Sequence, residues 1–391
     1  MLTFEKFSGI NNVQPSHRLG DDALTVATNV DIGLTGDISR RKGYSEILAT
    51  CHKNLHQAAG FLLATVDGGD LTAMNAAGGA RVTLYPSLGI NRVWYCDLPD
   101  GRVTFSNGLI CGVTDGLTAT SWGVPIPSGL GALTEIGGDL DPGDYQYQMT
   151  YVRLSDGLEG GAIYSGPLPI ASGGVFLSGL PTLAGHAINV YLTGANGDEA
   201  FFAGSTTGSM FSYIGANDAL TLPCRTGNLS PAPAGTVTAF WRGRVLLAVG
   251  NVLYASKTNQ WELFDFRRDF KQFADNITLI QPVDGGVFIG TEKELAFLSG
   301  SEFDKLVYVR AVAGTVVLGS GVAVPGEHIQ QGQGVGQGAA MVCIADKCLL
   351  AGFSGGSVIR MTEGRYATTA TEVAATFRVT DGIPQYIAIP Q

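Results

Sequence analysis

Short apolar runs separated by polar turns recur along most of the chain. From residue 54 onward, turns rich in Gly, Asn and Asp return every ~8–12 residues, the spacing of strands in sandwiches, barrels and propellers. In residues 237–300 the apolar runs are nearly continuous rather than alternating. Continuous runs indicate strands covered on both faces, as in stacked four-stranded propeller blades. Because almost no window has helical periodicity, the pattern predicts an all-β fold with a degenerate β-propeller-like body.

The pattern changes in residues 132–226, which lie between two stretches rich in Pro and Gly. Residues 143–153 alternate with a period of two, which predicts a half-buried strand. This Tyr-x-Tyr-x-x-Thr-Tyr strand, the Gly-Leu-Glu turn at residues 157–159 and the later Ile-Asn-Val-Tyr-Leu-Thr run resemble a fibronectin type III-like module. The resemblance implies an inserted β-sandwich domain of the fibronectin III or immunoglobulin type.

The length of the chain also favours more than one core. At 391 residues it exceeds the ~250–300 residues beyond which single cores stop growing. We therefore expect an N-terminal arm and first strand in residues 1–50, a first propeller part in 51–131, the inserted sandwich in 132–226 and a second propeller part in 227–391. A strand near residues 385–389 is expected to pair beside the first blade and close the ring.

Composition indicates a chain that buries surface against other subunits. Charged residues make up 15% of it, against about 25% in typical soluble domains, while hydrophobic residues make up 45%. No apolar run approaches the ~18 residues of a membrane-spanning helix, so no membrane span is expected. Because obligate interfaces resemble a domain core, we expect the apolar surface to be covered at such interfaces.

The N-terminus and the cysteines indicate where the chain is assembled. Glu5 and Lys6 stand near the N-terminus, and no apolar segment of a secretory signal follows them. The six cysteines are scattered along the chain rather than spaced as a disulfide framework. We therefore expect reduced thiols and assembly in a bacterial cytoplasm.

Two stretches, taken in order, resemble a known family. The first 45 residues contain Phe-Ser-Gly-Ile-Asn-Asn from Phe7, Ala-Thr-Asn-Val from Ala27 and Arg-Arg-Lys-Gly-Tyr from Arg40. The second half contains an Arg-x-Arg-x-Leu run from Arg242, and the aromatic cluster after it comprises Trp261, Phe264 and Phe266. Both stretches are similar to the tail nozzle proteins of short-tailed bacteriophages, also called tail tubular protein B.

This resemblance implies a virion structural protein of the phage tail, assembled in the host cytoplasm. Proteins of that family form a ring, of six copies, below the portal and adaptor. The same role here would extend the tail channel, conduct or gate genome DNA during ejection, and dock other tail proteins, fibres or spikes. The expected partners are therefore copies of the chain itself, the portal and adaptor, and other tail proteins.

The charge pattern favours passage of DNA over binding. The formal net charge is −10, whereas a protein that grips duplex phosphates needs clustered Lys and Arg. The basic clusters are Arg40, Arg41 and Lys42 in the arm, and Arg267 with Arg268; we interpret both sets as interface residues. A channel wall of the same sign as DNA opposes adhesion, so genome DNA would pass without specific binding.

No motif in the chain predicts catalysis. The Gly-Phe-Ser-Gly-Gly run at residues 352–356 has nucleophile-elbow spacing, but no histidine follows Ser354 and a strand is expected where the elbow needs a helix. Residues 334–339 fit a loose dinucleotide-binding pattern, but a β-hairpin is expected after it instead of a helix. We interpret both stretches as loops.

Candidate metal ligands also fail on spacing. The spacing of Cys51, His52 and His56 matches no zinc pattern. The other two candidates, Cys343 and Cys348, lie far away in sequence, and we expect them to face each other, or nearly so, across a hairpin. These residues therefore predict no zinc site.

A run of aspartates receives the same interpretation. Asp139, Asp141 and Asp144 offer oxygen ligands, but no acidic residue stands at the closing position of an EF-hand loop. Turn chemistry explains the Asp-Pro-Gly-Asp sequence. We therefore expect no catalytic residue, no cofactor and no metal, and a protein that is not an enzyme.

Two other classes of function stay open. A receptor-binding or tail-spike protein that contacts host surface glycan would present exposed aromatic residues on loops. A soluble propeller enzyme would need His or carboxylate groups on a central channel, and the sequence shows no such constellation. The tryptophans lie within or beside expected strands: Trp94, Trp122, Trp241 and Trp261.

Overall fold

The computed structural model describes residues 6–391 except 34, 44, 47, 67, 76–80, 172, 332, 333 and 381. Residues 1–5 of the expected arm, and Tyr44 at the close of the phage-like motif, lie outside the described residues. The described part contains strands and short 3-10 helices but no α-helix, so the predicted all-β class is confirmed; the 3-10 helices are η1 (Ser16–Arg18), η2 (Asn217–Ala219) and η3 (Gly326–His328). Within that part, no helix has the length and apolarity needed to span a membrane.

Five antiparallel sheets follow one another along the chain, two before and three after residues 132–226. The first sheet contains β5 (His52–Gln57), β6 (Phe61–Val66), β7 (Asp70–Asn75) and β8 (Val82–Tyr85). The second contains β9 (Trp94–Asp97), β10 (Val103–Ser106), β11 (Cys111–Thr114) and β12 (Ala119–Ser121). Each strand pairs with the next in sequence, which is a simple meander.

The three later sheets continue the series. The third contains β22 (Thr236–Trp241), β23 (Arg244–Val249), β24 (Val252–Lys257), β25 (Gln260–Phe264) and β26 (Phe270–Gln272). The fourth contains β27 (Ile277–Val283), β28 (Gly286–Thr291), β29 (Glu294–Ser299) and β30 (Val307–Ala313). The fifth contains β31 (Val322–Pro325), β34 (Ala339–Ala345), β35 (Cys348–Phe353) and β36 (Val358–Arg360), and a small hairpin of β32 (Gln330–Gln331) and β33 (Gly334–Val335) stands between β31 and β34.

Tight turns fix the register of these meanders. Arg242 and Gly243 join β22 to β23 with φ values of 47° and 77°, and Asp346 and Lys347 join β34 to β35 with φ values of 48° and 63°. Positive φ at both central residues belongs to the type I′ turn, whose twist matches that of the flanking strands. The sequence therefore encodes the hairpins locally, in turns of two residues.

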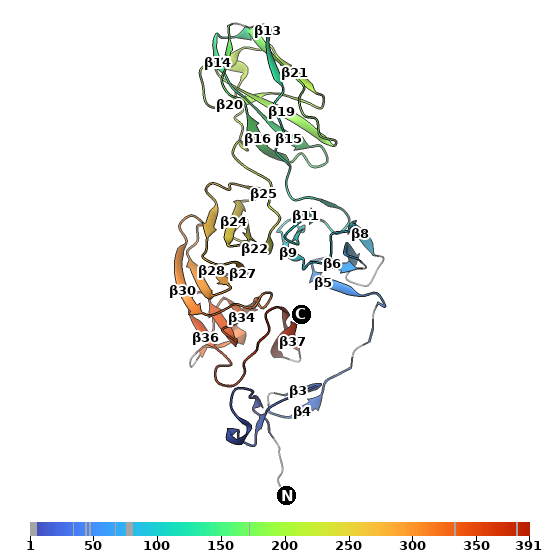
Figure 1. The fold of residues 1–391 in the computed structure, drawn as a ribbon, viewed down its shortest axis with the longest axis vertical. Coiled ribbons are helices and arrows are strands. Elements are labelled where there is room, and N and C mark those ends of the chain that lie inside the picture. Colours follow the sequence, from blue (N-terminus) through green and yellow to red (C-terminus); the bar gives the residue numbers. More distant parts are fainter. Residues whose placement is uncertain are drawn as a thin grey trace.

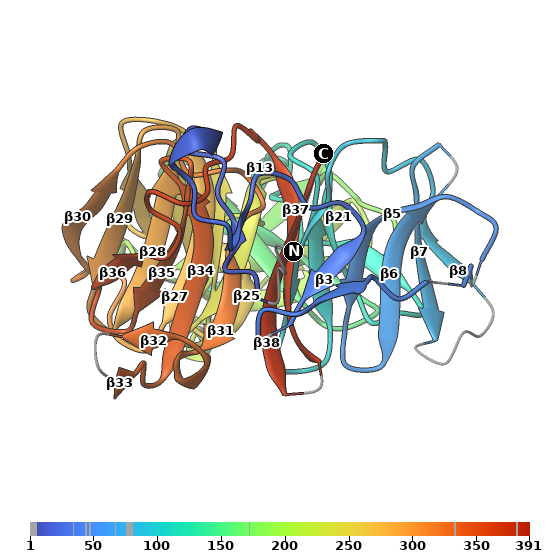
Figure 2. The ribbon, with the colours of Figure 1, turned by 90° about the horizontal axis from the view of Figure 1, so that it is seen from below.

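The sheets stand beside one another in Figure 2, and hydrophobic clusters join successive sheets. Val113 of the second sheet shares a cluster with Val245 of the third. Leu246 packs with Val287 of the fourth sheet, and Phe288 packs with Met341 of the fifth. Adjacent residues such as Val245 and Leu246 thus enter different clusters, so both faces of a strand are buried. This arrangement is the physical reason for the continuous apolar runs.

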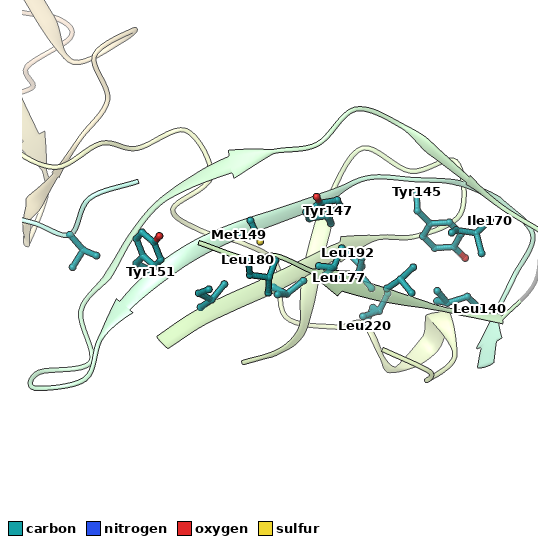
Figure 3. Close-up of a cluster of buried hydrophobic side chains, with 14 residues drawn as sticks. Leu140, Tyr145, Tyr147, Met149, Tyr151, Ile170, Leu177, Leu180, Leu192 and Leu220 are labelled. Atoms are coloured by element: carbon teal, nitrogen blue, oxygen red, sulfur yellow. The ribbon is translucent and has the colours of Figure 1, made fainter. Parts of the chain in front are cut away.

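Residues 132–226 form a separate set of sheets, set apart from the five others at one end of the molecule (Figure 1). One sheet contains β13 (Ala132–Leu140), β18 (Gly173–Ser178) and β21 (Met210–Tyr213). The other contains β16 (Glu159–Tyr164), β15 (Tyr147–Arg153), β19 (His186–Thr193) and β20 (Ala200–Thr206), and a third pair joins β14 (Gly143–Tyr145) to β17 (Leu168–Ile170). Both larger sheets contribute to one core, shown in Figure 3. That this segment is an inserted sandwich domain stays a prediction.

The predicted half-buried strand at residues 143–153 is wrong in two respects. The segment forms two strands, β14 and β15, interrupted at Gln146. Every residue of β15 except Val152 is buried, including Thr150, whose hydroxyl hydrogen-bonds to Glu159. The polar positions therefore alternate with apolar ones but do not face water. β15 lies between β16 and β19 in its sheet, and Glu159 of β16 accepts hydrogen bonds from Thr150 of β15 and Asn189 of β19.

The N-terminal segment is an arm outside the five sheets (Figure 1). Its strands pair only with one another: β1 (Gly9–Ile10) with β2 (Ala23–Leu24), and β3 (Val30–Ile32) with β4 (Ile38–Arg40). Among the described residues of 6–50, Gly36 alone is buried. Asn12 ties this arm to the C-terminal half, because it hydrogen-bonds with backbone groups of Arg365 and Ala367.

The predicted closure by a terminal strand is wrong. The last strand, β38 (Ile383–Pro390), pairs only with β37 (Val373–Thr380), and the first sheet consists of β5 to β8 alone. The hairpin packs on the fifth sheet instead, where Phe377 and Tyr386 join the cluster around Val324 and Phe353. β37 and β38 form eight residue pairs with each other, and neither pairs with a strand of the first sheet.

Candidate interaction surfaces and a central cavity

The first predicted interface set lies on the arm. Arg40 ends β4, and Arg41 and Lys42 follow it; all three side chains are exposed. Within the described part of the chain none of the three forms an ion pair. Exposed apolar side chains accompany them, since Val26 is 74% and Leu48 is 51% exposed. The arm thus exposes positive charge and apolar side chains together, and its described residues form no hydrophobic core.

The second predicted set lies elsewhere. Figure 1 places β4 below the sheets and β25 at their opposite end, next to residues 132–226. Arg267 and Arg268 follow β25 and line a groove of about 520 Å³. Three further cations line the same groove, which the sequence did not suggest: Arg225, Arg244 and Lys257. The structure therefore does not bring the two predicted sets together.

Two buried carboxylates partly neutralise this basic groove. Lys257 Nζ lies 2.7 Å from Asp269 Oδ2 and 3.5 Å from Asp265 Oδ2, and Arg244 Nη1 lies 3.4 Å from Asp269 Oδ2. Burial acts to raise the pKa of Asp265, but the backbone N–H of Arg267 and the charge of Lys257 outweigh it, so the pKa is lowered. Arg268 has no ion-pair partner among the described residues, and the groove stays basic on a protein whose net charge is −10.

The motif at residues 352–356 has no elbow geometry. Ser354 follows β35 in a turn, and its hydroxyl lies 2.8 Å from the carbonyl oxygen of Ala339 and 3.1 Å from Asp284 Oδ2. The next element is β36, which is a strand, as expected. The Ser354 hydroxyl therefore fastens the turn to the neighbouring sheet. In the loose dinucleotide pattern, Gly334 and Val335 form β33, although residues 332 and 333 before it lie outside the described residues.

The metal candidates do not converge among the described residues, where no group of three His, Cys, Asp or Glu side chains could hold an ion. His52 Nδ1 lies 2.7 Å from the carbonyl oxygen of Thr50. Cys343 lies opposite Leu350, so Cys343 and Cys348 are diagonal neighbours across the hairpin. All six cysteines are free, and burial raises the pKa of the Cys343 thiol to about 12.

The aspartate run has local roles. The carbonyl oxygen of Asp141 accepts a hydrogen bond from the Tyr145 hydroxyl at 2.8 Å, and the N–H of Asp144 donates to Asn196 at 3.1 Å. The N–H of Asp139 donates to the carbonyl oxygen of Ile214. These contacts order the turn between β13 and β14, as turn chemistry predicts.

The tryptophans are not presented on loops. Trp122 is buried and donates its indole N–H to the carbonyl oxygen of Trp261, whose own indole N–H donates to Gly243. Trp241 is 3% exposed, and the guanidinium of Arg92 lies 4.4 Å from the ring centroid of Trp94. These positions do not supply the exposed aromatic loops that a glycan-binding surface would need.

The sequence missed a cavity of about 280 Å³ into which the first strands of four sheets converge. His56 of β5 lines it; its Nε2 lies 2.9 Å from Asp97 Oδ1, and its ring stacks on Tyr95 at 4.9 Å. Arg92 also lines it, and its Nη1 lies 3.0 Å from Glu372 Oε1. Nothing in the sequence indicated these two contacts, because the paired residues lie 41 and 280 positions apart in the chain.

Comparisons with known proteins identify no relative. No family model and no curated protein matches the chain. Solved structures that are similar include a streptogramin B lyase (9% identity, 83% of this chain and 89% of that one, TM-score 0.32). A second is a β-propeller domain of Myceliophteria thermophila Cps50, with 10% identity over 83% of this chain and 92% of that one and a TM-score of 0.30. A third is YCF48 from Cyanidioschyzon merolae, with 8% identity over 85% of this chain and 90% of that one and a TM-score of 0.32. TM-scores of this size assign no activity, and the description of the fold rests on the strand order given above.

Proposed function

We propose that this chain is a structural protein of a bacteriophage tail that assembles with copies of itself into a ring, extends the tail channel and docks other tail proteins. The observation that carries self-assembly is the arm. Its two strand pairs are ordered, yet Gly36 is its one buried residue among those described, and Val26, Ile38 and Leu48 are exposed. Ordered strands need a covering surface, and another subunit supplies it. The assignment to a phage tail rests on the similarity of the two sequence stretches.

At the level of the fold, we propose a β-propeller-like body that carries an inserted β-sandwich of fibronectin III or immunoglobulin type. Consecutive meanders of four or five strands, joined by clusters between sheets, support the body. The separate core of residues 132–226 supports the insertion. So does Tyr145, whose hydroxyl donates back to the carbonyl oxygen of Asp141, as in the tyrosine corner of immunoglobulin-like sandwiches.

The charge distribution supports passage of DNA. A net charge of −10 opposes adhesion to phosphates, and the two basic sets lie at opposite ends of the sheets rather than in one stripe. The groove around Arg267 and Arg268 is better suited to an acidic surface of a neighbouring subunit or tail protein. We propose that it is a docking site within the assembly.

The test compares the purified full chain with a variant that lacks residues 1–49. The full chain is expected to form closed rings, visible in electron micrographs and as a single high-mass species by sedimentation. The shortened variant is expected to stay monomeric with an unchanged unfolding temperature. A full chain that is monomeric at high concentration and is not incorporated into particles contradicts the ring. Tight, salt-sensitive binding of bare duplex DNA contradicts passage.

A further inference from the structure

The C-terminal hairpin occupies the place of a sixth sheet but has only two strands. It lies between the fifth sheet and the first sheet (Figure 1 and Figure 2). Ala375 of β37 lines the central cavity together with His56 of β5 and Thr278 of β27, which are the first strands of their sheets. β37 therefore corresponds to a first strand and β38 to a second. The five other sheets have four or five strands, whereas no third strand pairs with β38 among the described residues.

Backbone N–H groups point out of the open edge of β38. Val373 of β37 is paired with Pro390, but its N–H donates to the carbonyl oxygen of Leu318 at 3.0 Å rather than to β38. Along an antiparallel ladder, pairs that exchange hydrogen bonds alternate with pairs that do not. Tyr386 and Ala388 share the phase of Pro390, so their N–H groups point away from β37. An open edge of this kind can accept a further strand through its main chain.

Two prolines limit the length of this edge. Pro384 and Pro390 occupy outward-pointing positions on either side of Tyr386 and Ala388, and proline has no N–H to donate. Prolines at such positions protect an edge strand against uncontrolled pairing. The donors between the two prolines therefore fit a short added strand and exclude a long one.

The arm contains a hairpin of matching size. β3 and β4 have three residues each and pair only with each other among the described residues, so they too have open edges. Asn12 fastens the arm beside Arg365 and Ala367, which precede β37, and Figure 1 shows β3 and β4 on the outer side of the C-terminal hairpin. Both elements expose apolar side chains, since Ile38 of β4 is 38% and Ile389 of β38 is 59% exposed. Two strands added to two make the four strands of the first and fifth sheets.

The arm of each chain is held to its own body at Asn12, while its hairpin extends away from the sheets and forms no described pair with β38 of the same chain. We propose that the β3–β4 hairpin of one copy adds to the open edge of β38 in a neighbouring copy and completes a four-stranded sheet there. Because two-stranded hairpins are marginally stable alone, both halves gain from this exchange. Exchange of an element between identical copies is a low-cost route to assembly. The proposal rests on the ring proposed above and names the surface that receives the arm.

Cross-linking between two versions of the full chain tests the exchange. Both carry Cys51→Ser, which removes the exposed native thiol; one also carries Ser39→Cys in β4 and the other Ile387→Cys in β38. A short bifunctional thiol reagent is expected to join the mixed versions into a covalent dimer, and neither version alone is expected to form one. If the parent chain sediments as a ring but the mixture gives no dimer, the exchange is overturned and the ring stands. A parent chain that sediments as a monomer overturns both.

A chain that carries both new cysteines distinguishes the two possible sources of the arm. Products that link different chains support the exchange. Products confined to single chains overturn it, because the arm then completes the sheet of its own chain.

Blocking the edge gives a second, independent measurement. Ala388→Pro removes an outward-pointing N–H, as Pro384 and Pro390 already do in the same strand, so the hairpin and the unfolding temperature of the monomer are expected to be unchanged. The dissociation constant of the ring is expected to rise roughly tenfold, the effect of about one hydrogen bond. Ala388→Ser keeps the N–H at nearly the same size and is the matched control, expected to assemble like the parent chain. A proline variant that assembles as tightly as the serine variant overturns the proposal.

Discussion

Residues 132–226 and the arm are both β-structures attached to the five sheets, but only one of them has a core. The middle segment covers Leu140, Tyr145, Leu177 and their neighbours between two sheets (Figure 3). The arm pairs strands of two or three residues in a single layer, with Gly36 alone buried among its described residues. A strand pair becomes independently stable only when a second layer covers its apolar face. The middle segment therefore has a hydrophobic core of its own, whereas the described residues of the arm do not form one.

The largest effect is expected when the middle segment, residues 132–226, is separated from the rest of the chain. Excision of residues 132–226, with their ends joined by a short Gly-Ser linker, is expected to leave a body that unfolds cooperatively. The clusters between the sheets contain no residue from that segment. Conversely, residues 124–229 expressed alone are expected to fold, and residues 1–49 alone are not. Circular dichroism and thermal unfolding measure each outcome. A body without a cooperative transition contradicts an independent middle segment.

Single substitutions sharpen the same contrast. Leu177 is fully buried in the core of the middle segment, and Leu177→Ala is expected to lower the free energy of unfolding by about 2–5 kcal/mol, because the cavity adds to the lost burial. Val26 in the arm is 74% exposed, and Val26→Ala is expected to change the stability of the monomer by less than about 0.5 kcal/mol. Urea unfolding monitored by fluorescence compares the two. Equal losses would show that the arm has a core of its own in the monomer.

The joint of the middle segment can be broken at Arg153. The Arg153 side chain is 8% exposed, and its Nη1 lies 3.0 Å from Asp156 Oδ2. Its Nη2 donates to the carbonyl oxygen of Ser121 at 3.0 Å and to that of Gly123 at 2.9 Å. Arg153→Ala removes a buried cation and its hydrogen bonds to Ser121, Gly123 and Asp156, so we expect a loss of about 2–4 kcal/mol and two separate unfolding transitions. Calorimetry resolves them. Arg18→Ala, on the exposed η1, is the control and should change nothing; a single unshifted transition in the Arg153 variant contradicts its role as the joint.

These regions also show what the sequence could and could not predict. Apolar runs and turn residues predicted hairpins such as the one that carries Cys343 and Cys348, because a two-residue turn such as Asp346–Lys347 is encoded locally. The second face of β15 was not predictable, because its polar residues are buried by partners such as Glu159 that the pattern does not reveal. The central cavity was missed for a related reason. Its lining depends on bulges at Val237 and Thr278 and on a contact between His56 and Asp97 that only the folded chain creates.

The joint of the arm is weaker than that of the middle segment. Asn12 donates its backbone N–H to Arg365 at 3.0 Å, donates its side-chain amide to Ala367 at 2.8 Å and accepts from the Ala367 N–H at 2.8 Å, all at exposed positions. Asn12→Ala keeps the backbone bond and is expected to cost about 1 kcal/mol locally. Hydrogen exchange should quicken at residues 365–367 without a change in global unfolding. Asn11→Ala, which affects only the local turn at Val13 and Gln14, is the control; unchanged exchange in the Asn12 variant would show that other contacts hold the arm.

The smallest expected effect on the monomer, and the most informative for assembly, is charge reversal at Arg40, Arg41 and Lys42. Their exposed side chains form no ion pair with the described residues, so the triple Glu variant is expected to unfold like the parent chain. If the arm covers an acidic surface of the next subunit, the variant adds repulsion where attraction is needed, and rings should dissociate at concentrations at which the parent chain is assembled. Lys347→Glu, at the exposed turn between β34 and β35, is the control and should assemble normally. Sedimentation at low and high salt measures the assembly of both chains, and high salt is expected to weaken the ring of the parent chain. A triple variant that assembles as well as the parent would show that the arm binds through its apolar residues alone.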